Sequence, residues 1–252
     1  MSGSKTENFH TYKTMAVSRN SDDDKKAFVQ KMFSDIAPDY DRLNRIISFN
    51  LDSSWRKKST ENLQYSNLVL DLCAGTGDMA SALFSHKNFK GKIILCDFSY
   101  EMLVLAKRKL QNYGEKAQIY LVCGDVEKLP FKAEIFEGVM LGFSLRNLDS
   151  QADFYRETRR VLRKGGTASF LEIAHPENIL FSKIFYLYFY KWVPFISQFF
   201  TKRKYAYQYL PDSLKIFPKQ KEVVKFIKTF DFQEVDYHNL MGGMAAVYKL
   251  VK

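Results

Sequence analysis

The sequence predicts an α/β fold built on a doubly wound, Rossmann-like parallel sheet. Short apolar strands alternate with amphipathic helical segments between residues 67 and 175, as in consecutive βαβ units. The first strand, Leu68–Leu70, is apolar throughout, which is typical of a strand buried on both faces of a parallel sheet. A glycine turn follows it and leads into a helix at Asp78. This arrangement predicts a ligand site at the carboxyl end of the first strand.

The glycine turn lies in LVLDLCAGTGDMA, residues 68–80. Gly75 and Gly77 lack a Cβ, so they permit a sharp strand-to-helix turn and the close approach of a ligand to the backbone. The dinucleotide spacing Gly-x-Gly-x-x-Gly is absent, and Asp78 stands where a pyrophosphate would need space. A nucleoside ligand without phosphate is therefore favoured. An NAD site and a turn that binds no ligand remain the alternatives.

Further strands are expected at Lys92–Cys96, Ile119–Cys123, Gly138–Leu141 and Thr167–Ile173, with a helix at Gln151–Arg163 before the last. Asp71, Asp97 and Asp125 follow three of the strands directly. Because the carboxyl ends of parallel strands meet at one edge of a sheet, we expect these carboxylates to converge on one crevice. Carboxylates at a crevice suit a ligand with hydroxyl donors or positive charge. S-adenosyl-L-methionine has a ribose, an ammonium and a sulfonium and no phosphate, so it fits better than NAD.

Composition sets the outer bounds on function. The chain has 252 residues, 46% of them apolar, and a formal net charge of +10, so an anionic partner must be considered. The three cysteines and four histidines have no metal-ligand spacing, and no metal site is expected. The N-terminus has no apolar signal core, and the most apolar window, Ile179–Phe200, is interrupted by charges and a proline. We therefore expect a cytoplasmic protein without a membrane span.

The chain divides into segments of different composition. Residues 1–21 are polar and without periodicity, which predicts a disordered tail. Residues 22–62 predict a helical cap, 67–175 a cofactor-binding core, and 176–230 an aromatic, helical insertion that faces substrate or membrane. Residues 231–252 predict closing strands at Glu234–Leu240 and Ala245–Val251, one of them antiparallel. The segments from residue 22 onward are expected to form one domain.

Successive motifs resemble those of class I S-adenosylmethionine-dependent methyltransferases. These are DLCAGTGD (71–78), CDFSYEML (96–103), GDVEKLPF (124–131), LRNL (145–148) and RVLRKGGTASFLEI (160–173). More narrowly, the chain resembles the ubiquinone/menaquinone-biosynthesis C-methyltransferases, which are UbiE-like. The narrower likeness rests on MFSDIAPDYDRLNRIISF (32–49), SWRKK (54–58), YLPDSLKIFP (209–218) and MGGMAAVYK (241–249), and it extends from about residue 31 to residue 252.

The resemblance implies a class I methyltransferase sheet, S-adenosyl-L-methionine as co-substrate and a polyprenylated quinol as acceptor. The cofactor contacts it implies are Asp71, Gly75, Thr76, Gly77, Asp97, Phe98, Asp125 and Val126. A serine of the family pattern falls on Gly142 here, and Ser144 is the proposed substitute for its hydrogen bond. Demethylmenaquinol is the favoured acceptor. The benzoquinol of ubiquinone biosynthesis, another small-molecule acceptor, and a scaffold subunit that binds quinones without catalysis remain alternatives.

The catalytic candidates are Arg146, Asn147 and Tyr40. Arg146 and Asn147 follow the fourth strand, where the acceptor should meet the methyl group. Arg146 is expected to stabilise a quinolate or to orient a water that takes its proton, unless it pairs with an acid such as Asp149. Tyr40, with Asp41, is expected to close over the site from the N-terminal helices. His175 is a secondary candidate for the base, with a loop histidine satisfied by hydrogen bonds as the preferred interpretation.

The aromatic stretch Phe181–Phe200 and the basic Lys202–Lys204 suit a lipid-tailed substrate and anionic headgroups at the inner face of the cytoplasmic membrane. A helical core patch beside a solvated basic turn is the alternative. RNA is not expected as a partner, because no recognisable RNA-binding module accompanies the charge. The sequence leaves open whether the chain forms a homodimer.

Overall fold

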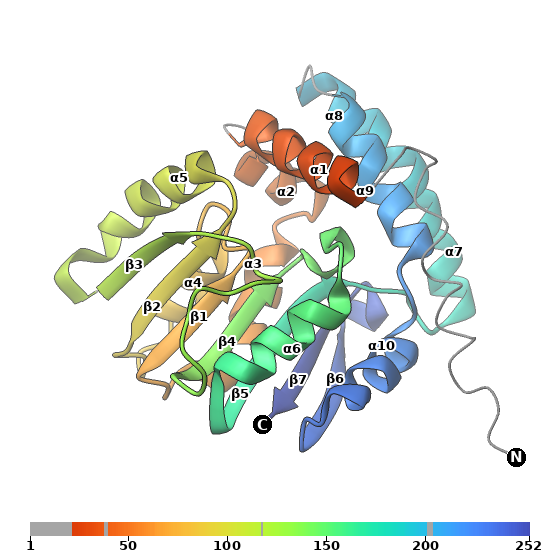
Figure 1. Ribbon diagram of the computed structural model, residues 1–252. Coiled ribbons are helices and arrows are strands. Elements are labelled where there is room, and N and C mark those ends of the chain that lie inside the picture. The colour runs from red at the N-terminus through yellow and green to blue at the C-terminus, as the bar shows by residue number, and fades with distance from the viewer. Residues whose placement is uncertain (1–21, 38–39, 117, 201–203) are drawn as a thin grey trace, which may run out of the picture.

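The computed structural model describes residues 22–37, 40–116, 118–200 and 204–252, so the predicted tail lies outside the described residues. Its centre is a seven-stranded sheet with the order β3-β2-β1-β4-β5-β7-β6 (Figure 1). The strands are β1 (Leu68–Leu72), β2 (Lys92–Asp97), β3 (Gln118–Cys123), β4 (Phe136–Gly142), β5 (Leu162–Ile173), β6 (Glu234–Leu240) and β7 (Ala245–Val251). Strands β1 to β5 are parallel, and β7 runs antiparallel to both β5 and β6. The predicted fold class is confirmed.

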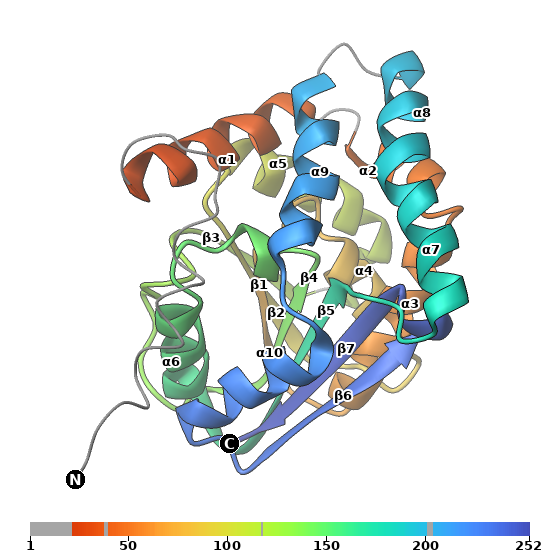
Figure 2. The same cartoon turned by 90° about the vertical axis from the view of Figure 1, so that its right-hand side faces the viewer.

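Helices cover both faces of the sheet (Figure 2). One face carries α3 (Leu51–Thr60), α4 (Asp78–Phe84) and α5 (Tyr100–Leu110), and the other carries α6 (Gln151–Val161) and α10 (Gln220–Ile227). Helix α6 ends two residues before the predicted end at Arg163. Leu162 has extended dihedral angles and pairs with Phe136, so β5 begins earlier than expected. Short 3₁₀ turns at Glu61–Leu63, Gln111–Lys116, Leu145–Asn147 (η4), Lys228–Phe230 and Met241–Gly243 complete the set.

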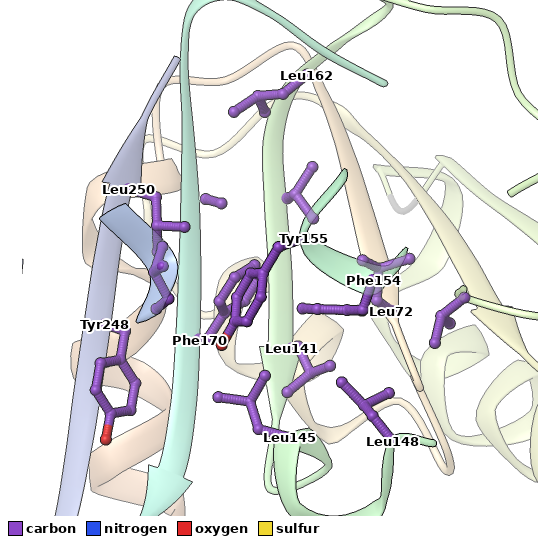
Figure 3. Packing of buried hydrophobic residues seen from close by; sticks show 14 of the residues in the cluster. Leu72, Leu141, Leu145, Leu148, Phe154, Tyr155, Leu162, Phe170, Tyr248 and Leu250 are labelled. Carbon is purple, nitrogen blue, oxygen red and sulfur yellow. The ribbon is translucent and has the colours of Figure 1, made fainter. Parts of the chain in front are cut away.

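Aromatic side chains pack among leucines in the core beneath α6 (Figure 3). Phe154 and Tyr155 of α6 are fully buried against Phe170 of β5, with ring centroids 5.3 and 6.1 Å from the Phe170 ring. Leu141 of β4 and Tyr248 of β7 extend the same cluster. Burial of side chains of this size stabilises the fold by roughly 1.5–3 kcal/mol each. This packing fixes β4 and β5, whose carboxyl ends carry much of the site.

A helical cap stands over the carboxyl ends of the strands (Figure 1). It contains α1 (Asp22–Ile36), α2 (Tyr40–Ile47), α7 (Ile179–Leu187), the π-helical segment Tyr188–Trp192, α8 (Val193–Phe200) and α9 (Lys204–Ile216). Met32 and Leu43 from the first two helices share one buried cluster with Phe185, Phe189 and Leu214. The early and late segments of the chain thus form one cap. Helices α3 and α10, from the same stretches of sequence, pack on the sheet instead.

Candidate functional site

The turn between β1 and α4 holds three residues with positive φ: Cys73 (49°), Gly75 (52°) and Gly77 (81°). The Gly75 N–H donates to Asp97 Oδ2 at 2.8 Å, and a Cβ on Gly75 would meet nothing nearer than the Cys73 carbonyl oxygen at 4.0 Å. A Cβ on Gly77 would lie 3.0 Å from Leu110 Cδ1. Gly75 therefore leaves space for a ligand, whereas Gly77 permits α4 to pack closely on α5.

A first cavity opens beside this turn at the ends of β1, β2 and β4. Its lining includes Cys73, Gly75, Asp97, Phe98, Asp125, Val126, Ser144 and Asn147, with Val29, Phe33 and Tyr40 closing it from the cap. Asp97 accepts hydrogen bonds from the Gly75 and Ser99 N–H groups, both at 2.8 Å. Burial raises the pKa of Asp97, and these N–H donors oppose the rise. Asp97 and Asp125 thus face one cavity, as the sequence predicted.

Asp71 does not join them. It is fully buried and lines neither of the two cavities. Burial raises the pKa of Asp71 well above its usual range. The predicted convergence of three carboxylates was therefore wrong for this residue. The groups around its side chain include Arg56, whose charge opposes the rise in the pKa of Asp71, and the backbone of Ala80 in α4.

Thr76 also points away from the first cavity. Its Oγ1 donates to Asp41 Oδ1 at 2.6 Å and accepts from Lys109 Nζ at 3.0 Å. Lys109 forms ion pairs with Asp41 and with Asp78. The expected closure by Asp41 therefore takes the form of a polar link from α2 to the glycine turn and α5. Any contact between Thr76 and a cofactor remains a prediction.

Gly142 at the end of β4 is explained by its neighbours. A Cβ there would lie 2.8 Å from Met79 Cγ and 2.9 Å from Arg56 Nη1. A serine at this position, which the resemblance implies, would collide with both. Ser144, two residues later in the sequence, lines the first cavity. Its hydrogen bond to a cofactor, in place of that serine's, stays a prediction.

A second cavity adjoins the first beneath the cap. Its apolar wall comes from the cap helices and the end of β5, and consists of Met32, Phe33, Ile36, Ile47, Ile173 and Leu210. Its polar and aromatic lining consists of Tyr40, Asn44, Ser48, Asp52, Trp55, Arg56, Phe143, Arg146, Asn147, Tyr209 and Ser213. Phe33, Tyr40 and Asn147 line both cavities. These three residues mark the place where the two spaces meet.

Arg146 lies in the second cavity and is 8% exposed. Its Nε donates to Glu172 Oε1 at 2.8 Å, its backbone N–H to Glu172 Oε2 at 3.2 Å, and its Nη1 to Ser213 Oγ at 2.9 Å. The acid that pairs with Arg146 is thus the fully buried Glu172 of β5, and the alternative partner Asp149 was wrong. These bonds fix the orientation of the guanidinium and leave its free edge toward the cavity.

Tyr40 and His175, the other titratable candidates, differ in placement. Tyr40 stands at the junction of the cavities, and burial raises the pKa of its hydroxyl while Arg56 opposes the rise. His175 lines neither cavity: its Nδ1 lies 2.8 Å from Tyr186 Oη and its Nε2 2.8 Å from the Phe217 carbonyl oxygen. The interpretation of His175 as a satisfied loop histidine is confirmed, and a role as base is not supported.

The comparison with known families decides the identity of the chain. A model described as the ubiE/COQ5 methyltransferase family matches residues 19–252. The chain belongs to this family. It is 35% identical over 222 residues to the ubiquinone/menaquinone biosynthesis C-methyltransferase UbiE of Geotalea daltonii, which covers 87% of this chain and 94% of that protein.

Two further comparisons agree. The chain is 34% identical over 228 residues to the demethylmenaquinone methyltransferase of Bacillus subtilis, which covers 90% of this chain and 97% of the relative. Among solved structures, a SAM-dependent methyltransferase from Aquifex aeolicus superposes with a TM-score of 0.56 at 16% identity, over 78% of this chain and 89% of that one. This ubiE/COQ5 family member is therefore a SAM-dependent C-methyltransferase with the class I fold.

Several lining residues of this methyltransferase were missed by sequence reasoning. Asp52 just before the SWRKK motif, Arg56 within it and Tyr209 of the late YLPDSL motif line the second cavity, whereas Lys109 of α5 binds Thr76 of the glycine turn. The signal that could have found Arg56 is the coincidence of a family motif on an amphipathic helix with a basic residue one position after Trp55. Lys109 carried no such signal. In the part of the chain that the structure describes, no group of three His, Cys, Asp or Glu residues could hold a metal ion.

The aromatic helices have two different sides. Phe185, Phe189 and Val193 are buried in the cap, whereas Leu180 is 72% exposed and Ile179, Ile184, Leu187, Trp192 and Phe195 are also exposed. Lys202 and Arg203 lie outside the described residues. None of the described helices combines the length and the hydropathy that crossing a bilayer requires. One side of the stretch is therefore core, as the alternative interpretation expected, and the other is an exposed apolar face whose contact with a lipid tail or a membrane stays a prediction.

Proposed function

We propose that this chain transfers a methyl group from S-adenosylmethionine to a ring carbon of a polyprenylated quinol, with demethylmenaquinol as the acceptor. The observation that carries the proposal is the pair of cavities at the carboxyl edge of the sheet, joined at Phe33, Tyr40 and Asn147. A methyl transfer needs two sites of this kind, because donor and acceptor must meet in line without a covalent enzyme intermediate.

The first cavity suits the cofactor. Bound S-adenosylmethionine supplies an electrophilic methyl group on a sulfonium. Asp97, Asp125, Glu127 and Asp149 line the cavity, and the described lining contains no lysine or arginine. Such a lining favours hydroxyl donors and a cation over a phosphate. Asp97 would accept from the ribose hydroxyls, Phe98 and Val126 would contact the base, and the open side of Gly75 would admit the ligand to the backbone.

The second cavity suits the quinol. Aromatic and aliphatic walls from α1, α2, α9 and β5 accept a fused ring and the start of an isoprenoid tail. Arg146, held by Glu172 and Ser213, would stabilise negative charge on a ring oxygen or orient a water that takes its proton. Holding both partners at near-attack distance accounts for roughly 7–11 kcal/mol of the barrier. Asn147 and Tyr40 would align ring and methyl group at the junction.

The exposed face of α7–α8 supports access from a membrane. Its side chains Ile179, Leu180, Ile184, Leu187, Trp192 and Phe195 combine with a net charge of +10. Insertion of such a face into the interface, with attraction to anionic lipid, would deliver a lipid-tailed acceptor to the second cavity. In a flotation assay at low salt the protein should rise with anionic vesicles, and Leu180→Glu/Ile184→Glu should abolish this. Failure of the wild-type protein to float would contradict the proposed contact with the membrane.

The proposal of demethylmenaquinol rather than a benzoquinol as the acceptor rests on the names of the relatives. Those from Bacillus subtilis and Desulfitobacterium hafniense are named demethylmenaquinone methyltransferases, while that from Geotalea daltonii carries both quinones in its name. The test is an assay with methyl-labelled S-adenosylmethionine and either demethylmenaquinol or the demethylated benzoquinol, with product detection by mass spectrometry. Label in menaquinol supports the proposal. Label only in the benzoquinol product would show that the acceptor is the benzoquinol and not demethylmenaquinol.

A scaffold subunit without catalysis is distinguished by calorimetric titration with S-adenosylmethionine. We expect saturable one-site binding, because Asp97 and the open turn at Gly75 form a site for which a scaffold has no use. Absence of binding by folded protein would favour the scaffold.

A further inference from the structure

We infer that Asp52 of α3 is the general base of the methyl transfer and that Arg56, one turn later, binds the oxygen from which Asp52 takes the proton. This inference rests on the proposed function and deepens it, because it assigns the acceptor's hydroxyl to a particular end of the second cavity. The two side chains lie four residues apart on one helix, so they share a face that lines the cavity.

The carboxylate of Asp52 is held at one oxygen and open at the other. Ser48 Oγ donates to Oδ1 at 2.7 Å and so fixes the orientation of the group. Oδ2 lies 3.6 Å from Arg56 Nε, which is too far for a hydrogen bond. Asp52 is only 6% exposed, and the surface it retains faces the cavity it lines. A hydroxyl placed there would find a carboxyl oxygen to which no donor lies at hydrogen-bond distance.

The guanidinium of Arg56 is buried with its donors incompletely used. It is 6% exposed, its contacts with Asp52 and Asp78 are 3.6 and 3.7 Å, and its Nε has no hydrogen-bond partner among the described residues. An arginine has five N–H donors, and a buried donor that makes no hydrogen bond costs free energy. The guanidinium also lies 4.9 Å from the Phe143 ring centroid, and Gly142 leaves the space it occupies. An acceptor oxygen in the cavity would satisfy these donors.

A second buried donor points to the same missing acceptor. Trp55 lines the second cavity, is 6% exposed, and its Nε1–H has no partner in the part of the chain that the structure describes. Buried indole N–H groups are ordinarily hydrogen-bonded. Two consecutive residues of α3 that line one cavity therefore each carry a buried N–H without a partner among the described residues, on the same helix as Asp52.

The other base candidates are placed less well. His175 lines neither cavity, and Arg146 cannot accept a proton. Asp52 is the only carboxylate among the described residues that line the second cavity. The charged and titratable groups facing it are Arg56 on its own helix, Tyr40 on α2, Arg146 on η4 and Tyr209 on α9, with Asp78 of α4 behind Arg56. The two guanidinium groups place positive charge beside the position proposed for the acceptor's oxygen.

The proposed reaction begins at a ring hydroxyl of the quinol. The ring hydroxyl's O–H bond breaks, the proton goes to Asp52 Oδ2, and the electron pair stays on the ring oxygen beside Arg56. That charge raises electron density at the neighbouring ring carbon, which forms its bond to the methyl carbon as the C–S bond breaks with its pair on sulfur. The proton of the methylated ring carbon then leaves to solvent, and the ring oxygen takes back the proton held by Asp52, so that the aromatic quinol and the base are both restored. A positioned base of this kind contributes about 10²–10⁴-fold.

The test compares Asp52→Asn and Asp52→His with wild-type protein, using demethylmenaquinol and S-adenosylmethionine. Asp52→Asn keeps the shape of the side chain, so its kcat should fall about 10²-fold or more while its Kd for S-adenosylmethionine stays within about twofold. In Asp52→His the acid limb of the pH–rate profile should move up by about 2–3 pH units, the difference between ordinary carboxyl and imidazole pKa values. Quenching of tryptophan fluorescence by 2-methyl-1,4-naphthoquinone should show that both variants still bind a quinone ring. Asp236→Asn, at an exposed position on β6, is the matched control.

Failure of the base assignment and failure of the proposed function would give different results. If wild-type protein methylates the quinol but Asp52→Asn keeps its kcat within about threefold, or Asp52→His keeps the wild-type acid limb, the base assignment is overturned and the proposed function stands. Wild-type protein that binds S-adenosylmethionine and transfers no methyl group to the quinol overturns both. A variant that loses kcat together with quinone binding and cofactor binding has lost its fold, and Asp52→His then decides through its pH profile.

Discussion

The two cavities are built from different parts of the chain. The first is formed largely by residues that directly follow strands, such as Gly75, Asp97 and Asp125, with the cap closing it on one side. The second is formed largely by residues of α1, α2, α3, η4 and α9, which extend from Met32 to Ser213, 181 positions apart in the sequence. The sheet thus provides a general cofactor edge, and the helices added before and after it shape the acceptor space. Specificity for the acceptor resides in the cap.

Two buried arginines show the same contrast within the acceptor cavity. Arg146 is bound by Glu172 and Ser213 at hydrogen-bond distance, whereas Arg56 has only contacts longer than 3.5 Å with its acids. The bonds to Glu172 and Ser213 fix the orientation of the Arg146 guanidinium and leave one edge of it for the acceptor. A guanidinium with unsatisfied donors at a cavity wall is prepared for a ligand.

The largest effect is expected from removal of the acid that holds Arg146. Glu172→Ala leaves a buried guanidinium without its charge partner, so the free energy of unfolding should fall by about 3–5 kcal/mol. Asp52→Asn should cost about 1.5 kcal/mol or less, because Asp52 makes one hydrogen bond and a long ion pair. Urea unfolding of both variants measures the difference. Equal losses would show that the two arginines are held alike.

A smaller effect is expected at Gly142, where Arg56 of α3 packs against the end of β4. Gly142→Ser places a Cβ 2.8 Å from Met79 and 2.9 Å from Arg56 Nη1, so Arg56 must move. Overpacking of this kind costs about 1–3 kcal/mol. Quinone affinity should weaken while the Kd for S-adenosylmethionine changes little. Gly138→Ala, which crowds Leu63 and Val69 at the opposite end of β4, is the control for a general loss of stability. Unchanged stability in Gly142→Ser would mean that Arg56 is free to shift.

The smallest effect concerns His175 and depends on pH. Burial lowers the pKa of His175, so the unfolded chain takes up a proton at higher pH than the folded one. Its contribution to stability is therefore complete above the ordinary histidine pKa of about 6.5 and is lost as the pH falls below it. His175→Gln should destabilise the protein more at pH 7.5 than at pH 5.5, as denaturant titrations at the two values would show. A kcat reduced tenfold in folded His175→Gln would restore the histidine as a base candidate.

The sheet was predictable because its signals are local. Apolar runs closed by Asp71, Asp97 and Gly124 mark strand ends, and the closing strands were predicted with the bounds they have. The sequence could not indicate on which side of a strand an acid lies. Asp71 and Asp97 follow their strands equally in the sequence, yet Asp71 is fully buried and lines neither cavity, whereas Asp97 binds the backbone of the turn. Strand register and twist decide this, and they are tertiary properties.

The acceptor cavity was only partly predictable. Arg146 and Asn147 were predicted from their place after the fourth strand. The structure adds the partners of Arg146, Glu172 and Ser213, which lie 26 and 67 positions away. Asp52 and Arg56 have no periodicity that separates them from an ordinary charged helix face. Their significance follows from burial and unused hydrogen-bonding capacity, which only packed coordinates reveal.

The central claim, that one cavity binds the cofactor and the other the quinol ring, is tested most directly by crossed binding measurements. Asp97→Ala and Trp55→Phe each change one cavity alone, and both are titrated with S-adenosylmethionine by calorimetry and with 2-methyl-1,4-naphthoquinone by equilibrium dialysis. We predict that Asp97→Ala loses about 10-fold or more in cofactor affinity with quinone affinity kept, because hydrogen bonds to a charged group contribute about 1.5–3 kcal/mol. Trp55→Phe should weaken quinone binding alone. Equal losses of both ligands in either folded variant would contradict the assignment.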